Sequence, residues 1–185
     1  RDFCLSRGLG DVYKRQKVFY EHLGFYGKDL RLAKLEQYIS NQGKMDSFKE
    51  SFKKIRGKEW EEARGTYNFF KKAVIQAVVE CGAMSEEDAA LWFNDKTPVD
   101  YSVGQLVDEI KAYVDSKPKG FRLLFMIDEA GQYIGTNTSM LLNLQSLIEK
   151  LGSVCRGQVW IVATGQEALD EMIKVRTDEF SRIMA

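Results

Sequence analysis

The sequence predicts an α/β protein in which part of a parallel sheet is combined with an all-helical segment. Two short apolar runs, Leu123–Ile127 and Val159–Ala163, are separated by a helical pattern over about 138–151. From Lys17 to about Asn94, by contrast, apolar residues recur at spacings of three and four, and no strand pattern is convincing. A strand, a helix and a second strand joined by short connections indicate parallel strands.

The first sixteen residues, RDFCLSRGLGDVYKRQ, differ in character from the rest of the chain. They resemble the translated sequencing adapter found at the ends of assembled fragments, so we expect a non-native or disordered leader that packs poorly. The alternative is an ordinary loop and strand that lead into a helix. The expected division is therefore a leader over 1–16, a helical insertion over 17–97 and an α/β part over 98–185.

Apolar spacing and local stop and start signals define the helices of the insertion. The expected helices cover about 29–42, about 45–55 (closed by Gly57), a long stretch from Glu59 to a stop near Gly82, and a short segment from Ser85 to about Phe93. Trp60, Tyr67 and Phe70 lie on the apolar stripe of the long helix. We therefore expect them in the core and not in a surface that stacks on bases.

The part after Pro98 begins with a capping-box pattern, Ser102-x-x-Gln105, which opens a helix. A turn over 116–120 follows, and then the run Leu123–Ile127, whose unbroken apolar character is typical of a strand buried on both faces. The next helix is expected over Thr138–Leu151, ending at Gly152. The second strand, Val159–Ala163, is also expected to be buried, and another helix begins near 166.

Composition excludes several classes of function. The 185 residues are 44% hydrophobic, which is enough for a packed core, and 27 basic residues balance 27 acidic ones. No net charge therefore draws the whole chain to nucleic acid or to anionic lipid. No apolar run approaches the roughly 20 residues of a membrane span, and no secretory signal is apparent. Three cysteines fit neither a zinc pattern nor a disulfide framework, which favours a cytoplasmic protein.

The segment Arg122–Glu129 indicates a functional site, because five apolar residues are followed by two adjacent acids. This is the pattern of a Walker B strand, whose final Asp holds Mg²⁺, usually through water. Asp128 is therefore the candidate magnesium ligand. Glu129 is the candidate for activating the water that attacks the γ-phosphate of ATP. The alternative is a strand that ends by chance in a polar turn.

The second strand also ends in polar residues, Thr164 and Gln166. In AAA+ proteins the strand beside Walker B ends in a polar sensor that contacts the γ-phosphate or the attacking water. Thr164 is the first candidate for this nucleotide-binding role and Gln166 the second. The alternative, which we favour for Thr164, is a helix cap, because Thr164 and Glu167 form a capping box. The two roles are compatible.

The phosphate-binding loop of a P-loop protein, G-x-x-x-x-G-K-[ST], does not occur in the sequence. Gly-Lys pairs stand at 27–28, 43–44 and 57–58, but Asp29, Met45 and Glu59 follow them. The loop is expected upstream of residue 17 in a longer parent, an expectation that the start at Arg1 favours; the alternative is a degenerate domain. The chain alone is expected neither to bind nor to hydrolyse ATP.

Four stretches together resemble the large P-loop ATPase of BREX phage-defence systems. They are KVFYEHLGFYGKDLRLAKLE (Lys17–Glu36), LLFMIDEAGQYIG (Leu123–Gly135), LNLQ (Leu142–Gln145) and ATGQEAL (Ala163–Leu169). The resemblance implies an ATP- and Mg²⁺-dependent AAA+ protein of the cytoplasm. It also implies that the P-loop precedes a helical insertion and that Walker B follows it, so 98–185 would be the Walker B and sensor half.

The resemblance further implies a homo-oligomeric parent that works with other BREX proteins, and with DNA as a further candidate partner. Members of the family often carry Ser where this chain has Gly165, which weakens any sensor role for residue 165. The main alternative is a non-hydrolysing AAA+ scaffold for assembly or DNA contact. A third hypothesis, a self-contained helical interaction protein, predicts that the two apolar strands are not neighbours.

Five basic residues gather along one predicted helix and its end: Lys49, Lys53, Lys54, Arg56 and Lys58. Contact with DNA phosphates is one interpretation. We favour a solvated helix face, because acidic residues flank the cluster and the chain as a whole has no positive charge.

Overall fold

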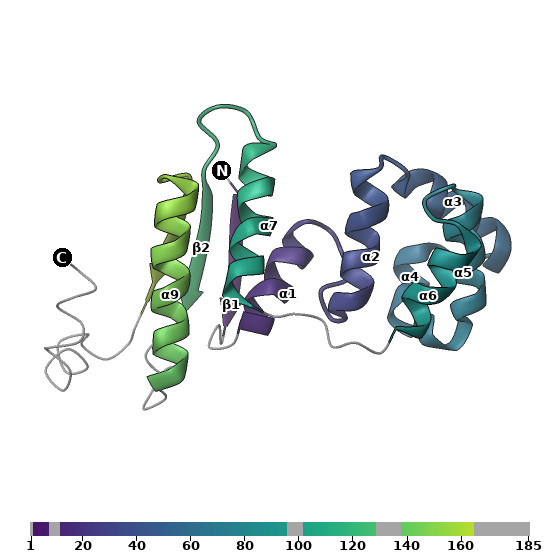
Figure 1. Ribbon diagram of the computed structural model, residues 1–185, viewed down its shortest axis with the longest axis horizontal. Helices are drawn as coiled ribbons and strands as arrows, with labels where there is room; N and C mark the ends of the chain where they lie inside the picture. Colours follow the sequence, from purple (N-terminus) through teal and green to yellow (C-terminus); the bar gives the residue numbers. More distant parts are fainter. Residues whose placement is uncertain (1, 8–11, 96–101, 129–137, 165–185) are drawn as a thin grey trace, which may run out of the picture. The chain divides into compact units, whose positions relative to one another are not determined.

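The computed structural model describes residues 2–7, 12–95, 102–128 and 138–164 (Figure 1). Side chains are described for 14–95, 102–127 and 142–164. The chain forms two compact units. One combines Arg1–His22 with Asp100–Ala185 and is called here the α/β unit; the other, Leu23–Val99, is the helical unit. The predicted division at 16 and 97 stays a prediction, although Lys17–His22 belongs to the α/β unit.

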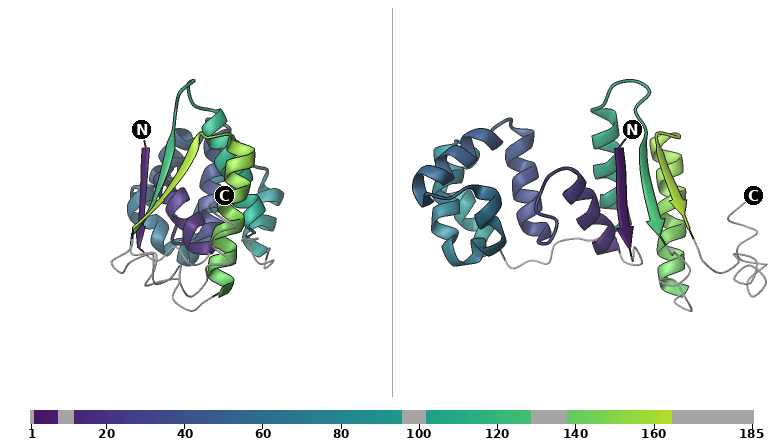
Figure 2. Two further views of the ribbon diagram at one scale, coloured as in Figure 1. Left: turned by 90° about the vertical axis from the view of Figure 1, so that its left-hand side faces the viewer. Right: turned by 180° about the vertical axis from the view of Figure 1, so that it is seen from behind.

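The α/β unit contains a sheet of three parallel strands in the order β1-β2-β3. The strands are β1 (Asp2–Arg7), β2 (Leu123–Asp128) and β3 (Val159–Ala163), and the helices are α1 (Val12–His22), α7 (Val103–Asp115) and α9 (Thr138–Cys155). Helices α7 and α9 lie together on one side of the sheet (Figures 1 and 2). The α/β class is thus confirmed, and β2 and β3 are parallel neighbours connected through α9, contrary to the third hypothesis.

The two faces of this sheet differ. Leu123, Phe125 and Ile127 of β2 are buried toward the helices, with Ile127 packed on Leu144 of α9. On β3, Trp160 is 59% exposed and Val162 is 41% exposed. The prediction that β3 is a buried strand is therefore wrong, because no described element covers its second face or its outer edge. The prediction that β2 is buried on both faces holds for one face only, since Leu124 and Met126 are half-buried.

The prediction that residues 1–16 pack poorly is also wrong. Backbone pairing joins Asp2–Arg7 to Leu123–Asp128 along six residues, and Gln16 of α1 is fully buried. The observed strand followed by a helix corresponds to the alternative interpretation of this segment. Local composition could not reveal it, since a strand is stabilised by its neighbours in the sheet and not by its own sequence alone.

The helical unit consists of five α-helices and one 3₁₀ helix in its described part. These are α2 (Leu30–Asn41), α3 (Met45–Arg56), α4 (Trp60–Ala63), η1 (Arg64–Phe70), α5 (Lys71–Glu80) and α6 (Glu86–Asn94). The expected single helix from Glu59 onward is wrong. Thr66 has a non-helical backbone (φ −123°, ψ 19°), so the chain tightens into η1 before α5 begins.

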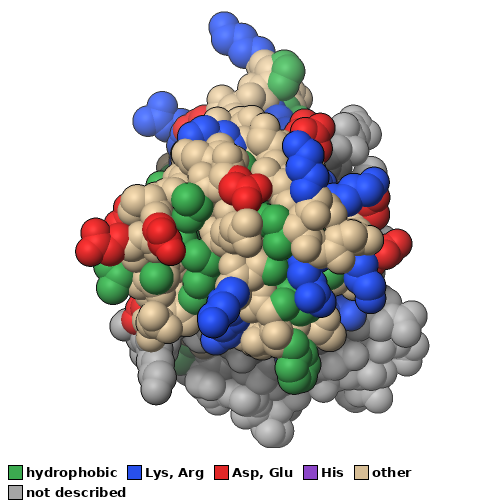
Figure 3. All heavy atoms as spheres, turned by 90° about the vertical axis from the view of Figure 1, so that its right-hand side faces the viewer, with side chains coloured by type: hydrophobic (Ala, Val, Ile, Leu, Met, Phe, Trp, Pro, Cys, Tyr) green, Lys and Arg blue, Asp and Glu red, His purple; other side chains and the backbone are tan. Residues whose placement is uncertain are grey.

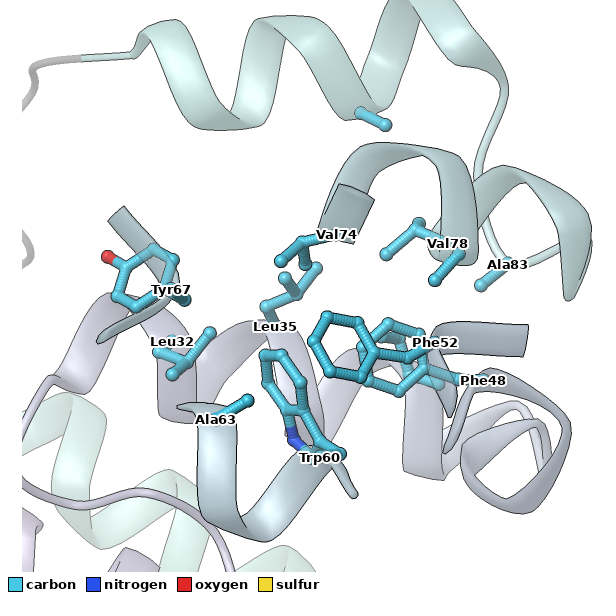
Figure 4. Packing of buried hydrophobic residues seen from close by; sticks show 13 residues of the cluster. Leu32, Leu35, Phe48, Phe52, Trp60, Ala63, Tyr67, Val74, Val78 and Ala83 are labelled. Carbon is cyan, nitrogen blue, oxygen red and sulfur yellow. The ribbon is translucent and has the colours of Figure 1, made fainter. Parts of the chain in front are cut away.

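An aromatic cluster forms the centre of the helical unit (Figure 4). The rings of Phe48 and Phe52 each meet Trp60 edge-on, with both centroid distances 5.0 Å, the geometry that aromatic pairs prefer. Trp60 and Tyr67 are buried, and Phe70 packs against Phe52. The prediction that these aromatic residues belong to the core is confirmed.

A buried carboxylate lies beside this cluster. Glu36 of α2 has no exposed surface, and its Oε1 accepts hydrogen bonds from Nε1 of Trp60 (2.6 Å) and from Nη1 of Arg64 (3.1 Å). Its Oε2 accepts from the backbone N–H of Tyr26. Glu36 therefore connects α2, α4, η1 and the segment before α2 through one charged group.

Two glycines give a test of where helices end. Gly57 ends α3 with φ +68°, whereas Gly152, predicted to end its helix, lies inside α9 with open space at its Cβ position. Alanine in the left-handed region costs about 1–2 kcal/mol, while alanine at a helical glycine stabilises by about 0.4–1 kcal/mol. We therefore expect Gly57→Ala to lower, and Gly152→Ala to raise, the denaturation midpoint followed by circular dichroism. A loss of stability in Gly152→Ala would contradict the continuous helix α9.

Candidate functional site

The candidate site lies at the carboxyl edge of the sheet, where β2 and β3 end. Asp128 is the last residue of β2, and Thr164 follows the last residue of β3. Because Ile127 pairs with Ala163 in parallel register, strands β2 and β3 end at the same level of the sheet. The backbone N–H of Thr164 donates a hydrogen bond to the carbonyl of Ile127 (2.8 Å). The backbone of Thr164 is thereby fixed next to Asp128.

The structure supports the predicted placement only in part. Thr164 is exposed at this edge. The side chain of Asp128, and all of Glu129 and Gln166, lie outside the described residues. Their proposed roles, and the helix that Thr164 was expected to cap, therefore stay predictions.

One neighbour of the site was missed from the sequence. Strand β1 ends at Arg7, whose Cα lies in register with that of Asp128, and α1 begins at Val12. A third parallel strand therefore reaches the same edge and is followed by a helix. The intervening residues 8–11 (Gly-Leu-Gly-Asp) contain glycines but lack the Lys-[Ser/Thr] pair that a phosphate-binding loop requires.

The interior beneath the edge is closed. Arg15 of α1 is buried and donates from Nη1 to the carbonyl of Asn143 in α9 (3.3 Å). A cavity of about 10 Å³ lies between Arg15 and apolar side chains of β2, β3, α7 and α9. This volume suits at most one water molecule. Any nucleotide would therefore bind outside the carboxyl edge and not within the described core of the unit.

A buried tyrosine connects α1 to α7. Burial, together with the nearby charge of Glu109 and a hydrogen bond to it, raises the pKa of Tyr20 far above its ordinary value. Tyr20 consequently stays a protonated hydrogen-bond donor across the physiological range. The hydrogen bond between Tyr20 and Glu109 thus joins α1 to α7.

The residue types at this edge are those of a site for a hard cation. Asp128 and Thr164 carry oxygen atoms in their side chains, and oxygen atoms are the ligands that Mg²⁺ prefers. In the described part of the chain, no three His, Cys, Asp or Glu residues come close enough together to hold a metal ion. Nor does any described helix have the length and apolar character needed to cross a membrane.

No family model matches the chain, and no solved structure matches it either.

Proposed function

We propose that this chain is the Walker B and sensor half of a P-loop ATPase of the AAA+ type, similar to the large ATPase of BREX systems. The observation that carries the proposal is the parallel adjacency of β2 and β3, which brings Asp128 and Thr164 to one edge. An acid that follows a buried strand is common, but an acid beside a second polar strand end is the arrangement that this chemistry requires.

In this proposal Asp128 would hold Mg²⁺, and the ion would neutralise negative charge on the phosphates of ATP. Glu129 orients the attacking water, and the Thr164 hydroxyl contacts the γ-phosphate or that water, with Gln166 as the second candidate. A longer parent protein supplies the phosphate-binding loop. The same proposal gives the parent a cytoplasmic location, homo-oligomeric assembly and other defence proteins as partners.

The test is a nucleotide-binding titration on the full-length parent, with and without magnesium. We expect Asp128→Ala to remove most of the magnesium-dependent gain in affinity, because the dication loses a carboxylate. Asp115→Ala is the matched control, since Asp115 is an exposed acid of the same unit that pairs only with Lys111 among the described residues. If magnesium raises the nucleotide affinity of Asp128→Ala as much as it raises that of the unmodified parent, the proposal is contradicted.

A non-hydrolysing scaffold is the second candidate. The upstream loop separates the two candidates, because a complete Gly-Lys-[Ser/Thr] sequence there favours hydrolysis and a degraded loop favours the scaffold. In this case the parent would bind ATP without turnover, and the AAA+ fold would serve assembly or DNA contact. A turnover assay of the unmodified parent separates the two candidates.

A further inference from the structure

One end of the helical unit is built from the last turn of α3 and the first turn of α5. The centroids of the Phe52 and Phe70 rings lie 5.8 Å apart, and the Arg56 guanidinium lies 4.9 Å from the centroid of the Phe70 ring. At the opposite end, Nζ of Lys44 donates to the carbonyl of Gly82. These interactions make α3 and α5 antiparallel neighbours, so cations distant in sequence come to the same end.

We name this region the basic end and define it by five exposed cations: Lys54, Arg56, Lys58, Lys71 and Lys72. Two lysines of the cluster seen in the sequence do not belong to it, because Lys49 pairs with Glu61 (2.6 Å) and Lys53 with Glu59. Among the described residues, no carboxylate pairs with the four lysines of the basic end. On the face shown in Figure 3, Lys and Arg side chains are spread among Asp and Glu side chains, with hydrophobic side chains between them.

An exposed aromatic residue, Phe69, stands two positions before Lys71 in the chain. Phe69 is 90% exposed, the highest value among the large hydrophobic residues of the described chain. The next residue, Phe70, contacts both the Phe52 ring and the Arg56 guanidinium. Helix α5 begins one residue later, at Lys71. The backbone at Phe69 is therefore anchored on the core while its ring faces solvent. An anchored, exposed ring beside lysines that no described carboxylate neutralises has no function in the packing of the unit.

We propose that the basic end binds single-stranded nucleic acid. The lysines and Arg56 would contact successive phosphates, and an unpaired base would stack on the ring of Phe69. A duplex offers phosphates but no free base face, so the ring favours a single strand. Two of the acids that follow α3 in the chain do not oppose this, because Glu59 and Glu61 are engaged by Lys53 and Lys49, whereas Glu50 of α3 and Glu62 of α4 have no described partner. The inference is independent of ATP chemistry at the sheet edge.

The experiment is fluorescence anisotropy with the 185-residue chain and labelled oligodeoxythymidylate and oligouridylate strands of about 20 nucleotides, longer than typical single-strand sites. We expect salt-dependent binding of at least one strand, and weaker binding of a duplex of equal length. In a plot of the logarithm of the binding constant against the logarithm of the salt concentration, Lys71→Glu with Lys72→Glu should reduce the steepness of the slope by about 1.4. This is about 0.7 for each phosphate that the protein no longer neutralises. Lys71→Arg with Lys72→Arg should retain binding.

Phe69→Ala should weaken binding of the single strand by about fivefold or more. Leu91→Ala is its matched control, because Leu91 is also strongly exposed (65%) in the same unit. Lys28→Glu with Lys119→Glu is the control for charge reversal, and circular dichroism verifies that each variant is folded. Equally weakened binding in variants and controls, or binding to phosphatidylserine vesicles without binding to either strand, would overturn the proposal.

Discussion

Glu129→Gln in the full-length parent is expected to abolish ATP turnover while leaving ATP binding nearly unchanged. Glutamine keeps the shape and hydrogen-bonding reach of the side chain but removes the basic oxygen that orients the attacking water. Such a loss acts on the transition state and scarcely on the ground state. Loss of a positioned base typically lowers the rate by about 10²-fold or more.

The measurement combines a steady-state turnover assay with a nucleotide titration on the same variant. Glu149→Gln is a suitable control, because Glu149 is an exposed acid of α9 that only accepts a hydrogen bond from Gln145 among the described residues. Turnover at the parental rate in Glu129→Gln would remove Glu129 from the mechanism. An unmodified parent that binds ATP without turning it over would favour the scaffold.

Replacing Glu36 by alanine is expected to destabilise the helical unit by about 3–5 kcal/mol, the usual effect of breaking a buried ion pair. Alanine leaves Nε1 of the buried Trp60 without its acceptor, and it removes the carboxylate that pairs with Arg64, which keeps only the Gly24 carbonyl as a described acceptor. The unfolding transition of the helices can be followed in urea by far-ultraviolet circular dichroism.

Glu50→Ala provides the comparison, because Glu50 is an exposed residue of α3 for which a change within about 0.5 kcal/mol is typical. Glu36→Gln should fall between the two variants, since an amide still accepts from Trp60 but no longer neutralises Arg64. If Glu36→Ala and Glu50→Ala unfold at the same urea concentration, the Glu36 carboxylate does not stabilise the helical unit.

Elements with local signals could be predicted well from the sequence. Ser85 and Ser102 cap α6 and α7 as expected, each accepting a hydrogen bond from the backbone three residues on, and Gly57 closes α3 in the left-handed conformation. These signals depend on residues close together in the chain. The apolar runs of β2 and β3 likewise indicate their pairing, because each run presents an apolar side chain to the same cluster, Ile127 from β2 and Ile161 from β3.

Features that depend on tertiary packing could not be predicted. The apolar spacing of three and four continues through Thr66, so it conceals the break between α4 and α5. Gly152 continues a helix because neighbouring turns hold it, although glycine in isolation indicates an end. The basic end also depends on the antiparallel packing of α3 and α5, which brings Lys71 beside Arg56 and which no local pattern reveals.

At the candidate site, the sequence identified the residue types, and the structure adds the proximity of two strand ends. Thr164 could be placed because its backbone bonds to Ile127. The neighbouring position of Arg7 was missed, since the segment that contains it was excluded on composition. Register between distant strands is a property of the whole sheet, so it could not be inferred from any one of them.

The outer edge of β3 has a practical consequence for work with the isolated chain. A strand edge with unpaired N–H and C=O groups is a template for adding a strand from another molecule. In the part of the chain that the structure describes, no strand pairs with the outer edge of β3, and the side chains of Trp160 and Val162 are exposed there, so hydrogen bonding and apolar contact would act together. Concentrated preparations should therefore self-associate through this strand, and a lysine at position 162 would be the natural gatekeeper to keep them monomeric.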